Sequence, residues 1–315
     1  MADNKNTKCG YVAIIGAPNA GKSTLTNQMV GQKVSIITHK VQTTRFPVKG
    51  IVMNGDTQII VVDTPGIFAP KKRLDRAMVA SAWEGTKDAD CIVFMLDAPS
   101  INRAFARENQ GDNKVLEDYE RIIASLQDVK TPIILALNKI DEIEKSALLD
   151  LAKRCSDDVN YKHIMMISAL RNKGVGDLVN AISKEMPDGP FLYPEDQASD
   201  LPLRLMAAEI TREKVFERLH DELPYQSTVE TDQWQERRDG SVRIDQTLYV
   251  TRENHKRMVI GKGGETLKQI SRAAREDIIK ELERVVHLFV HVKVKENWTD
   301  DKSHYTERGL DFDAE

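Results

Sequence analysis

Short apolar runs recur through the first half of the chain, with helix-compatible segments between them. The runs are YVAIIG (11–16), QIIVVD (58–63), CIVFMLD (91–97), PIILALN (132–138) and HIMMIS (163–168). Nearly continuous apolar runs of this length are typical of strands buried on both faces of a sheet. A further segment, FPVKGIVMN (46–54), is expected to be an antiparallel edge strand paired with the strand that follows it. The pattern therefore predicts a doubly wound α/β domain with a mainly parallel sheet.

A stretch rich in proline and acidic residues, MPDGPFLYPEDQASDLP (186–202), interrupts this pattern and cannot continue a helix. Beyond it the chain predicts a smaller α+β domain: a helix, two strands, a short helix, a long helix and a strand, at about 203–220, 226–233, 241–251, 253–260, 264–284 and 285–295. In the long helix, the apolar residues recur every four positions and form one face: Ile270, Ala274, Ile278 and Leu282. We predict a first domain over 1–186, a linker over 187–202, a second domain over 203–298 and an acidic, loose tail over 299–315.

Composition narrows the class of protein. The 315 residues are 41% hydrophobic and 30% charged, which is ordinary for a globular protein with room for two domains. The net charge is −4, so a surface that binds nucleic acid must be local. The three cysteines, Cys9, Cys91 and Cys155, have no zinc or disulfide spacing and are expected to be reduced thiols. No apolar run approaches the roughly 20 residues of a membrane span, so we expect a soluble, cytoplasmic protein with at most a peripheral membrane contact.

The first candidate for chemistry is GAPNAGKS (16–23), which fits G-x-x-x-x-G-K-[ST] and lies between a predicted strand and a predicted helix. Gly16 and Gly21 let backbone N–H groups converge on a β-phosphate at the helix N-terminus. Lys22 can neutralise the β- and γ-phosphates, and Ser23 can offer its hydroxyl to Mg²⁺. The alternative is a glycine turn that fits the motif by chance. The companion motifs that follow it in the chain argue against this alternative.

Those companions each end an apolar run. In DTPG, Asp63 can hold the hydration shell of Mg²⁺ and the amide of Gly66 can meet a γ-phosphate, although a strand cap or a simple turn would look the same. In NKID, Asp141 can accept hydrogen bonds from N1–H and the exocyclic amine of guanine, a donor pair that adenine lacks. Lys139 can lay its stem along the base. In SAL, the Ala169 amide can meet the guanine carbonyl, and this assignment depends entirely on position.

The ordered series GAPNAGKS, DTPG, NKID and SAL resembles the translation-factor-related GTPases. The phrases VSIITHKVQTTR, DTPGIFAPKKRLDRAMVASAW and FLYPEDQASD are similar to the Era family of bacterial GTPases, and the likeness covers nearly the whole chain. The chain departs from the family pattern at Val41, where proline is usual, and across Phe46–Val48. The stretch Ile101–Asn113 is longer than in typical members.

The resemblance implies a switch threonine that joins the Mg²⁺ shell, here Thr44, with Thr43 as the weaker candidate. Ile67 stands where Ras-like enzymes use a glutamine to orient water, and Asn19 resembles an asparagine that helps to hold K⁺ in potassium-stimulated GTPases. We therefore expect slow turnover that K⁺ raises. The residues expected to act in catalysis are Lys22, Thr44, Asp63 and Gly66, and the metal ligands are Ser23, Thr44, Asp63 through water and, for K⁺, Asn19. The expected nucleotide-binding residues are Gly16, Ala17, Pro18, Asn19, Ala20, Gly21, Lys22, Ser23, Thr24, Asp63, Thr64, Pro65, Gly66, Asn138, Lys139, Asp141, Ser168, Ala169 and Leu170.

A second glycine-lysine loop, VIGKGG (259–264), fails the nucleotide test because Gly263 follows Lys262 where serine or threonine is required. It carries G-x-x-G between two predicted helices, the pattern of a KH loop that clamps single-stranded nucleic acid. Seven basic residues against two acidic ones lie between Arg252 and Arg275. A plain helix-helix turn is the alternative, and the surrounding αββααβ order, which resembles the KH domain of Era proteins, argues against it. The expected RNA-binding residues are Lys256, Arg257, Val259, Ile260, Gly261, Lys262, Gly263, Gly264, Lys268, Ile270, Arg272 and Arg275.

The resemblance implies a monomeric GTPase with Mg²⁺ as cofactor that binds the 3′ end of 16S ribosomal RNA during maturation of the 30S subunit, with a link to cell-cycle control. A binding-class alternative is a GTP-switched RNA chaperone or membrane-associated checkpoint protein with negligible turnover. An RNA-processing factor that uses ATP is a further alternative, against which Asp141 argues.

Overall fold

The computed structural model describes residues 7–107 and 113–314, which form two compact units. The first unit comprises the described residues within Met1–Ser35, Thr44–Asp200 and Gly309–Glu315, and the second comprises Ile36–Thr43 and Leu201–Arg308. Part of the long stretch 101–113, namely residues 108–112, lies outside the described residues. The domain boundaries given above remain our proposal for the chain.

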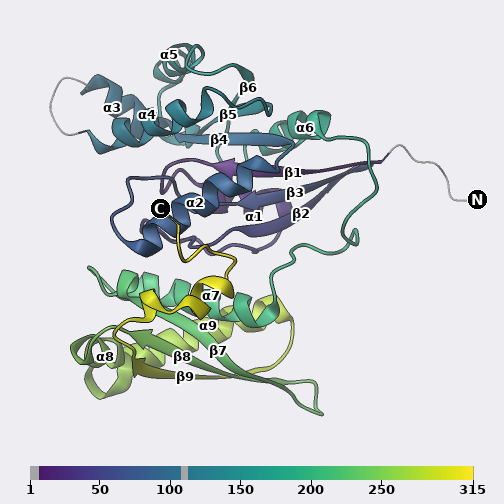
Figure 1. Cartoon of the computed structure of the whole chain (residues 1–315). Helices are drawn as coiled ribbons and strands as arrows, with labels where there is room; N and C mark the ends of the chain where they lie inside the picture. The colour runs from purple at the N-terminus through teal and green to yellow at the C-terminus, as the bar shows by residue number, and fades with distance from the viewer. Residues whose placement is uncertain (1–6, 108–112, 315) are drawn as a thin grey trace, which may run out of the picture. The chain divides into compact units, whose positions relative to one another are not determined.

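The first unit is built on a six-stranded sheet with the order β2-β3-β1-β4-β5-β6 (Figure 1). Its strands are β1 (Lys8–Ile15), β2 (Val48–Asn54), β3 (Thr57–Asp63), β4 (Cys91–Asp97), β5 (Ile133–Asn138) and β6 (Tyr161–Met166). The edge strand β2 runs antiparallel to β3, and all other pairs are parallel. The predicted mainly parallel α/β sheet with an antiparallel edge is confirmed.

Helices cover both faces of this sheet because successive strand residues point to opposite sides. Val12 and Ile14 of β1 pack with α1 and α6, whereas Ala13 and Ile15 pack in a second core with α2, α3, α4 and α5. The helices are α1 (Lys22–Val30), α2 (Arg73–Lys87), α3 (Ala98–Ala106), α4 (Lys114–Leu126), α5 (Lys145–Cys155) and α6 (Val175–Glu185), with a short 3₁₀ turn, η1 (Ile140–Glu142). The carboxyl ends of parallel strands share one edge of the sheet, which is where ligands bind in this class of fold.

The proline-rich stretch after α6 belongs to the first unit as far as Asp200 and lies against its sheet. The side-chain carbonyl of Gln58 accepts hydrogen bonds from the amides of Leu192 and Tyr193, at 2.9 and 3.0 Å. Further along, the Ser199 hydroxyl donates to the Lys49 carbonyl at 2.7 Å, on edge strand β2. Specific hydrogen bonds therefore hold this stretch beside the sheet.

The second unit has the αββααβ order expected of a KH domain. Its elements are α7 (Leu203–Arg218), η2 (Pro224–Gln226), β7 (Ser227–Glu236), β8 (Val242–Val250), α8 (Glu253–Ile260), η3 (Lys262–Gly264), α9 (Glu265–Leu282) and β9 (Val286–Val294). Strand β8 is central, antiparallel to β7 and parallel to β9 (Figure 1). The predicted apolar face of the long helix is confirmed, since Ile270, Ala274 and Ile278 are fully buried.

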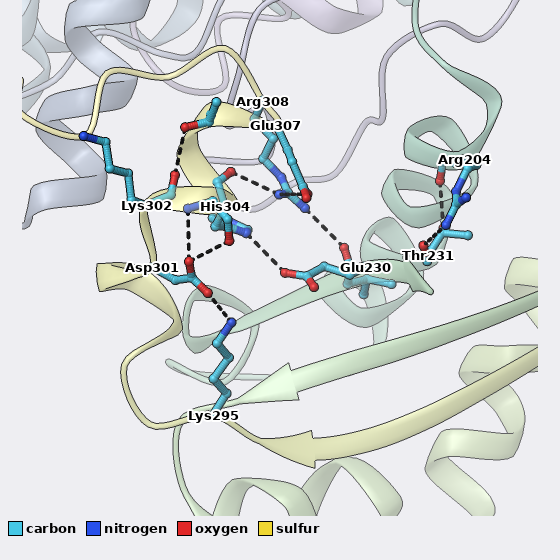
Figure 2. A network of polar contacts seen from close by, with 12 residues as sticks. Arg204, Glu230, Thr231, Lys295, Asp301, Lys302, His304, Glu307 and Arg308 are labelled. Carbon is cyan, nitrogen blue, oxygen red and sulfur yellow. Dashed lines mark hydrogen bonds and ion pairs between the residues drawn. The ribbon is translucent and has the colours of Figure 1, made fainter. Parts of the chain in front are cut away.

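The prediction of a loose tail is wrong for residues 299–308. A 3₁₀ turn, η4 (Trp298–Asp300), and a short helix, α10 (Lys302–Thr306), are packed with His304 and Tyr305 buried. In the network of Figure 2, His304 Nδ1 lies 3.6 Å from Glu230 Oε1, and Arg308 donates to the carbonyls of His304 and Val229 at 3.2 and 3.4 Å. Many acidic residues in a segment suggest exposure, but here aromatic rings and paired charges hold the segment against β7.

In the described part of the chain, the three cysteines are buried and no helix could cross a membrane. Cys9, Cys91 and Cys155 are buried free thiols, as expected. Burial raises the pKa of Cys91 to about 12 and that of Cys155 to about 11, so neither is poised as a thiolate. Within residues 7–107 and 113–314, every helix is too short or too polar to cross a bilayer.

Candidate nucleotide site and glycine-rich RNA loop

The GAPNAGKS loop connects β1 to α1, and its glycines are required by the backbone. Gly21 is the N-cap of α1 with a left-handed φ of 99°, and a Cβ there would lie 2.4 Å from Asn138 Nδ2. Only glycine adopts this conformation in so little space. The loop therefore leads the chain directly into a helix whose first amides are available to an anion.

Lys22, the first residue of α1, is buried under that loop. Its Nζ donates to the carbonyls of Gly16 and Ala17, at 3.1 and 3.0 Å. Burial lowers the pKa of Lys22 to about 8, against the opposing influence of the Asp63 carboxylate. A buried ammonium whose partners are neutral carbonyls is well suited to a polyphosphate, which would supply the compensating charge.

Three oxygen-bearing side chains from separate segments meet beside Lys22. Ser23 Oγ and Thr44 Oγ1 lie 2.8 Å apart. Asp63 is fully buried, and within the described residues neither of its carboxylate oxygens has a hydrogen-bond partner. Burial raises the pKa of Asp63, and the nearby hydroxyls of Ser23, Ser35 and Thr44 and the charge of Lys22 counter part of that rise.

This set fits Mg²⁺. Hydroxyl and carboxylate oxygens are hard ligands, and Mg²⁺ is usually held by one or two carboxylates together with phosphates and water. Over the part of the chain that the structure describes, no cluster of three or more His, Cys, Asp or Glu side chains forms a dedicated metal cage. A cation at this place would satisfy the buried carboxylate of Asp63 and would need the phosphates to complete its shell.

The DTPG loop closes over the phosphate loop. The Ile67 amide donates to the Gly16 carbonyl at 3.0 Å, and a Cβ on Gly66 would meet Pro18 at 2.8 to 2.9 Å. The Thr64 hydroxyl is buried and donates to the Ile14 carbonyl at 2.7 Å, so its side chain is committed to the fold. Ile67 is fully buried in a core cluster. No side chain at that position can orient an attacking water, as the sequence indicated.

NKID and SAL, the proposed base-recognition motifs, lie side by side because one asparagine connects them. Asn138 Nδ2 donates to the Ala20 carbonyl at 2.8 Å, and Asn138 Oδ1 accepts from the Ala169 amide at 2.9 Å. Asn138 thus fastens the base loops to the phosphate loop, a role that sequence reasoning did not foresee. Because the Ala169 amide already has a protein partner, a guanine carbonyl would share that donor.

Asp141 and Lys139 carry the charges of this loop. A hydrogen bond from the Ser168 hydroxyl, with smaller help from Arg171, holds the pKa of Asp141 below its usual value. Lys139 has a left-handed φ of 64°, and its Nζ lies 2.5 Å from Asp97 Oδ2. Asp97, which belongs to none of the sequence motifs, holds the lysine side chain in a fixed orientation.

The second glycine loop, in the other unit, has an open surface. Gly261, Gly263 and Gly264 have φ values of 72, 63 and 80°, and a Cβ on Gly261 would lie 2.2 Å from Thr266 Oγ1. A Cβ on Gly263 or Gly264 would meet nothing within 4 Å. These two positions leave room for a sugar-phosphate backbone directly before α9.

The predicted RNA-binding residues divide by exposure. Those that are exposed are Arg257, Lys262, Gly263, Lys268, Arg272 and Arg275, and Lys256, Ile260, Gly261 and Gly264 are half-buried. Arg272 Nε forms an ion pair with Glu276 Oε1, at 2.9 Å. The prediction that Val259 and Ile270 bind RNA is corrected. Both side chains are fully buried in the core, in a cluster that includes residues of β8, so neither can line an open groove. The exposed apolar side chain beside the loop is Met258, which the sequence reasoning missed.

Comparisons with known proteins decide the family. Residues 11–139 match the family described as "50S ribosome-binding GTPase", and residues 222–299 match the KH domain family. The GTPase Era of Caulobacter vibrioides is 54% identical over 98% of this chain and 98% of its own length. The GTPase Era of Brucella suis biovar 1 is 54% identical over 97% of this chain and 94% of its own length. The chain belongs to the Era family of GTPases.

Solved Era structures share the fold of this Era-family protein. A crystal structure of Era in complex with MgGDPNP and nucleotides 1506–1542 of 16S ribosomal RNA superposes with a TM-score of 0.83, at 38% identity, and covers 96% of this chain and 99% of that one. An Aquifex aeolicus Era variant bound to GDP and AlF4⁻ gives the same values. The α/β GTPase fold followed by a KH domain is thereby confirmed.

Proposed function

We propose that this Era-family GTPase hydrolyses GTP to GDP and phosphate while its KH domain holds 16S ribosomal RNA near the 3′ end during maturation of the 30S subunit. The observation that carries the proposal is the presence in one chain of two glycine loops with different neighbours. One leads to the buried Lys22 with Ser23, Thr44 and Asp63 beside it. The other is open, glycine-rich and flanked by exposed cations. The bound RNA of a 38% identical Era structure supports the choice of RNA.

In the nucleotide site, the phosphate loop amides and Lys22 bind the β- and γ-phosphates, and Asp141 orients the guanine. Ser23, Thr44 and, through water, Asp63 would hold Mg²⁺, which when bound neutralises charge on the β- and γ-phosphate oxygens. Lys22 gives up neutral carbonyl partners for phosphate oxygens, which strengthens its hydrogen bonds. The Gly66 amide faces the γ-phosphate, so its loop responds to hydrolysis.

Turnover is proposed to be slow and raised by K⁺. The buried Ile67 has no polar atom for a water, so backbone groups, Thr44 and a monovalent cation must orient the nucleophile. Asn19 is an exposed residue of the phosphate loop with a left-handed φ of 62°, and its side chain is our proposed K⁺ ligand.

In the RNA site, the exposed cations of α8 and α9 attract the backbone, and the open glycines admit it. We expect Ile260 and Met258, rather than the buried Val259 and Ile270, to supply apolar contact to bases. A monomeric, cytoplasmic protein is our proposal, together with the peripheral membrane contact and the cell-cycle link that the family resemblance implies.

Crosslinking in cells, with GTP present, followed by sequencing of the bound RNA, tests the assignment. Reads should concentrate at the 3′ end of 16S ribosomal RNA, and they should disappear for a Lys262→Asp, Gly263→Asp variant. Asp tolerates the left-handed backbone of Gly263 better than most residues, and its Cβ has free space, so this variant should fold. Recovery of no small-subunit RNA from the wild-type chain would refute the assignment.

A GTP-switched RNA chaperone with negligible turnover is the second candidate function, and the buried Ile67 is the observation that favours it. Phosphate release measured over many turnovers, with and without the RNA, separates the two. Release of several equivalents per protein, increased by the RNA, supports the enzyme; release of a single equivalent supports the chaperone.

A further inference from the structure

The segment Ile36–Thr43, called here the anchor segment, belongs to the same compact unit as α7 and the KH elements. The Ile37 amide donates to Glu213 Oε1 at 2.8 Å. Lys40 Nζ donates to the carbonyl of Phe216 and, at 2.6 Å, to that of Leu219. At the end of the segment, Arg212 Nη2 donates to the Thr43 carbonyl at 2.6 Å. Three points along eight residues are therefore fixed to one helix and the residue that caps it.

The side chains of α7 that make these contacts are fixed themselves. Arg212 and Glu213 are 1% and 3% exposed. Arg212 Nε donates to Glu209 Oε1 at 2.9 Å, its Nη2 donates to the other oxygen of the same carboxylate, and its guanidinium stands 5.3 Å from the Phe216 ring centroid. Buried charges are costly unless their partners hold them, so a shift of the Thr43 carbonyl would have to move this whole pair.

Lys40 acts on the other end of α7. The last carbonyls of a helix lack partners within the helix, and they carry the negative end of its dipole. The Lys40 ammonium donates to the carbonyls of both Phe216 and Leu219. It therefore gives these carbonyls a partner and places a positive charge at the negative end of the helix dipole. The position of the anchor segment therefore depends on the C-terminal end of α7 as well as on its buried middle.

The same helix is joined to the helix of the glycine-rich loop. Lys214 Nζ lies 2.7 Å from Asp277 Oδ2, and Arg218 Nη1 donates to Gln269 Oε1 at 3.0 Å. Both acceptors belong to α9, which begins directly after Gly264. An RNA strand that presses on the loop acts on α9, and α9 is tied to α7 by these two contacts.

We propose that Lys40 and Arg212 are positioning residues for GTP hydrolysis, which set the place of Thr44 according to what the glycine-rich loop holds. Thr44 follows the anchored Thr43 by a single peptide bond, and its hydroxyl meets Ser23. The Thr43 carbonyl and the Thr44 Cα lie in one planar peptide unit. A displacement of that carbonyl therefore also displaces Thr44 and its hydroxyl. The inference rests on the proposed RNA function, and it supplies a contact route between the RNA loop and Thr44.

The test uses full-length Lys40→Met, with Lys40→Arg as the conservative rescue and Lys153→Met, an exposed lysine of α5, as the matched control. GTP hydrolysis and the affinities for GDP and GDPNP are measured with and without an RNA of the sequence 1506–1542 of 16S ribosomal RNA. We expect kcat to fall about tenfold in Lys40→Met, because small misplacements of a positioned group cost one to two orders of magnitude. KM and GDP affinity should stay within about twofold. The factor by which RNA raises GDPNP affinity should fall toward one, and Lys40→Arg should restore both quantities.

Different failures have different meanings. If wild-type protein does not bind the RNA, the proposed RNA function fails and the inference falls with it. If the wild type binds RNA and responds to it, and Lys40→Met keeps both its kcat and its RNA response, the anchor alone is refuted. A variant that loses GDP affinity and RNA affinity together has lost its fold, and Arg212→Lys then decides: it keeps the buried charge but has no fork to serve both Glu209 and Thr43, and a wild-type RNA response in it would overturn the proposal.

Discussion

Ser23 Oγ and Thr44 Oγ1 are 2.8 Å apart, although 21 residues separate them in the chain. Ser23 stands in the first turn of α1, and Thr44 belongs to the stretch between α1 and β2. The contact brings a residue of fixed position together with one that can respond to the γ-phosphate. The buried carboxylate oxygens of Asp63 complete this group of side chains that could hold Mg²⁺.

Thr44 should act in hydrolysis and not in GDP binding. Thr44→Ala should lower kcat about a hundredfold, the typical loss for one group that acts at the transition state, and leave GDP affinity unchanged. Thr43→Ala should lose much less, because the Thr43 hydroxyl donates to the Lys40 carbonyl within its own segment. Single-turnover hydrolysis of the two variants checks this, and equal losses would show that Thr44 is not the switch threonine.

Lys22 predicts a pH dependence. Its pKa in the folded protein is about 8, against 10.5 ordinarily, so the folded protein holds fewer protons than the unfolded chain between these values. Stability contributed by this group therefore rises with pH through that window, whereas phosphate binding needs the charged form. GDP affinity should fall about fivefold between pH 8 and 9, because the charged fraction of the lysine falls from about one half to about one tenth. Equilibrium titrations of GDP at several pH values check this. Lys22→Gln should bind GDP more weakly, and its affinity should no longer change with pH in this window.

The elements predicted from sequence were those whose signal is local. Apolar runs such as CIVFMLD report a strand buried on both faces without any knowledge of its neighbours, and the structure places that run as β4. Ile270, Ala274 and Ile278 likewise gave the buried face of α9. The motifs of the nucleotide site were found because strand and turn residues adjoin them directly in sequence.

Features that depend on distant partners were missed. His304 and Arg308 look like solvent-exposed tail residues until Glu230 is brought beside them, about seventy positions away in the chain. The sequence identified the anchor segment only as part of a switch, since nothing in its residue types indicates a contact with Glu213 or with the end of α7. Val259 and Ile270 were predicted to bind RNA because the sequence shows that a residue is apolar, not which side of its helix the sheet covers.

Base specificity should depend on Asp141. Asp141→Asn exchanges a carboxylate for an amide that cannot accept both guanine donors, so GTP affinity should fall about a hundredfold or more while xanthosine triphosphate gains. Asp150→Asn, an exposed acid of α5, is the control. Competition binding with the two nucleotides measures the change, and an unaltered preference for guanine would remove Asp141 from the site.

Asn19 should make hydrolysis depend on the monovalent cation. Hydrolysis should be faster in K⁺ than in Na⁺ at equal ionic strength, and Asn19→Ala should abolish the difference. Because Asn19 has a left-handed φ of 62°, Asn19→Gly is the cleaner variant, since it removes the side chain without strain. Equal rates in both salts for the wild type would exclude the cation from the mechanism.

The two glycine loops should be separable by mutation. Lys262→Asp with Gly263→Asp places two carboxylates where the RNA backbone would pass, so RNA affinity should fall at least a hundredfold, while GTP affinity stays at the wild-type level. Lys280→Asp, at an exposed position near the far end of α9, changes the net charge by two, against three in the loop variant, and should weaken RNA binding only slightly. Titrations at several salt concentrations add a second criterion, because the loss of a phosphate contact lowers the slope of log affinity against log salt by about one. Loss of GTP affinity in the loop variant, with its fold intact by circular dichroism, would mean that the two loops do not serve separate phosphates.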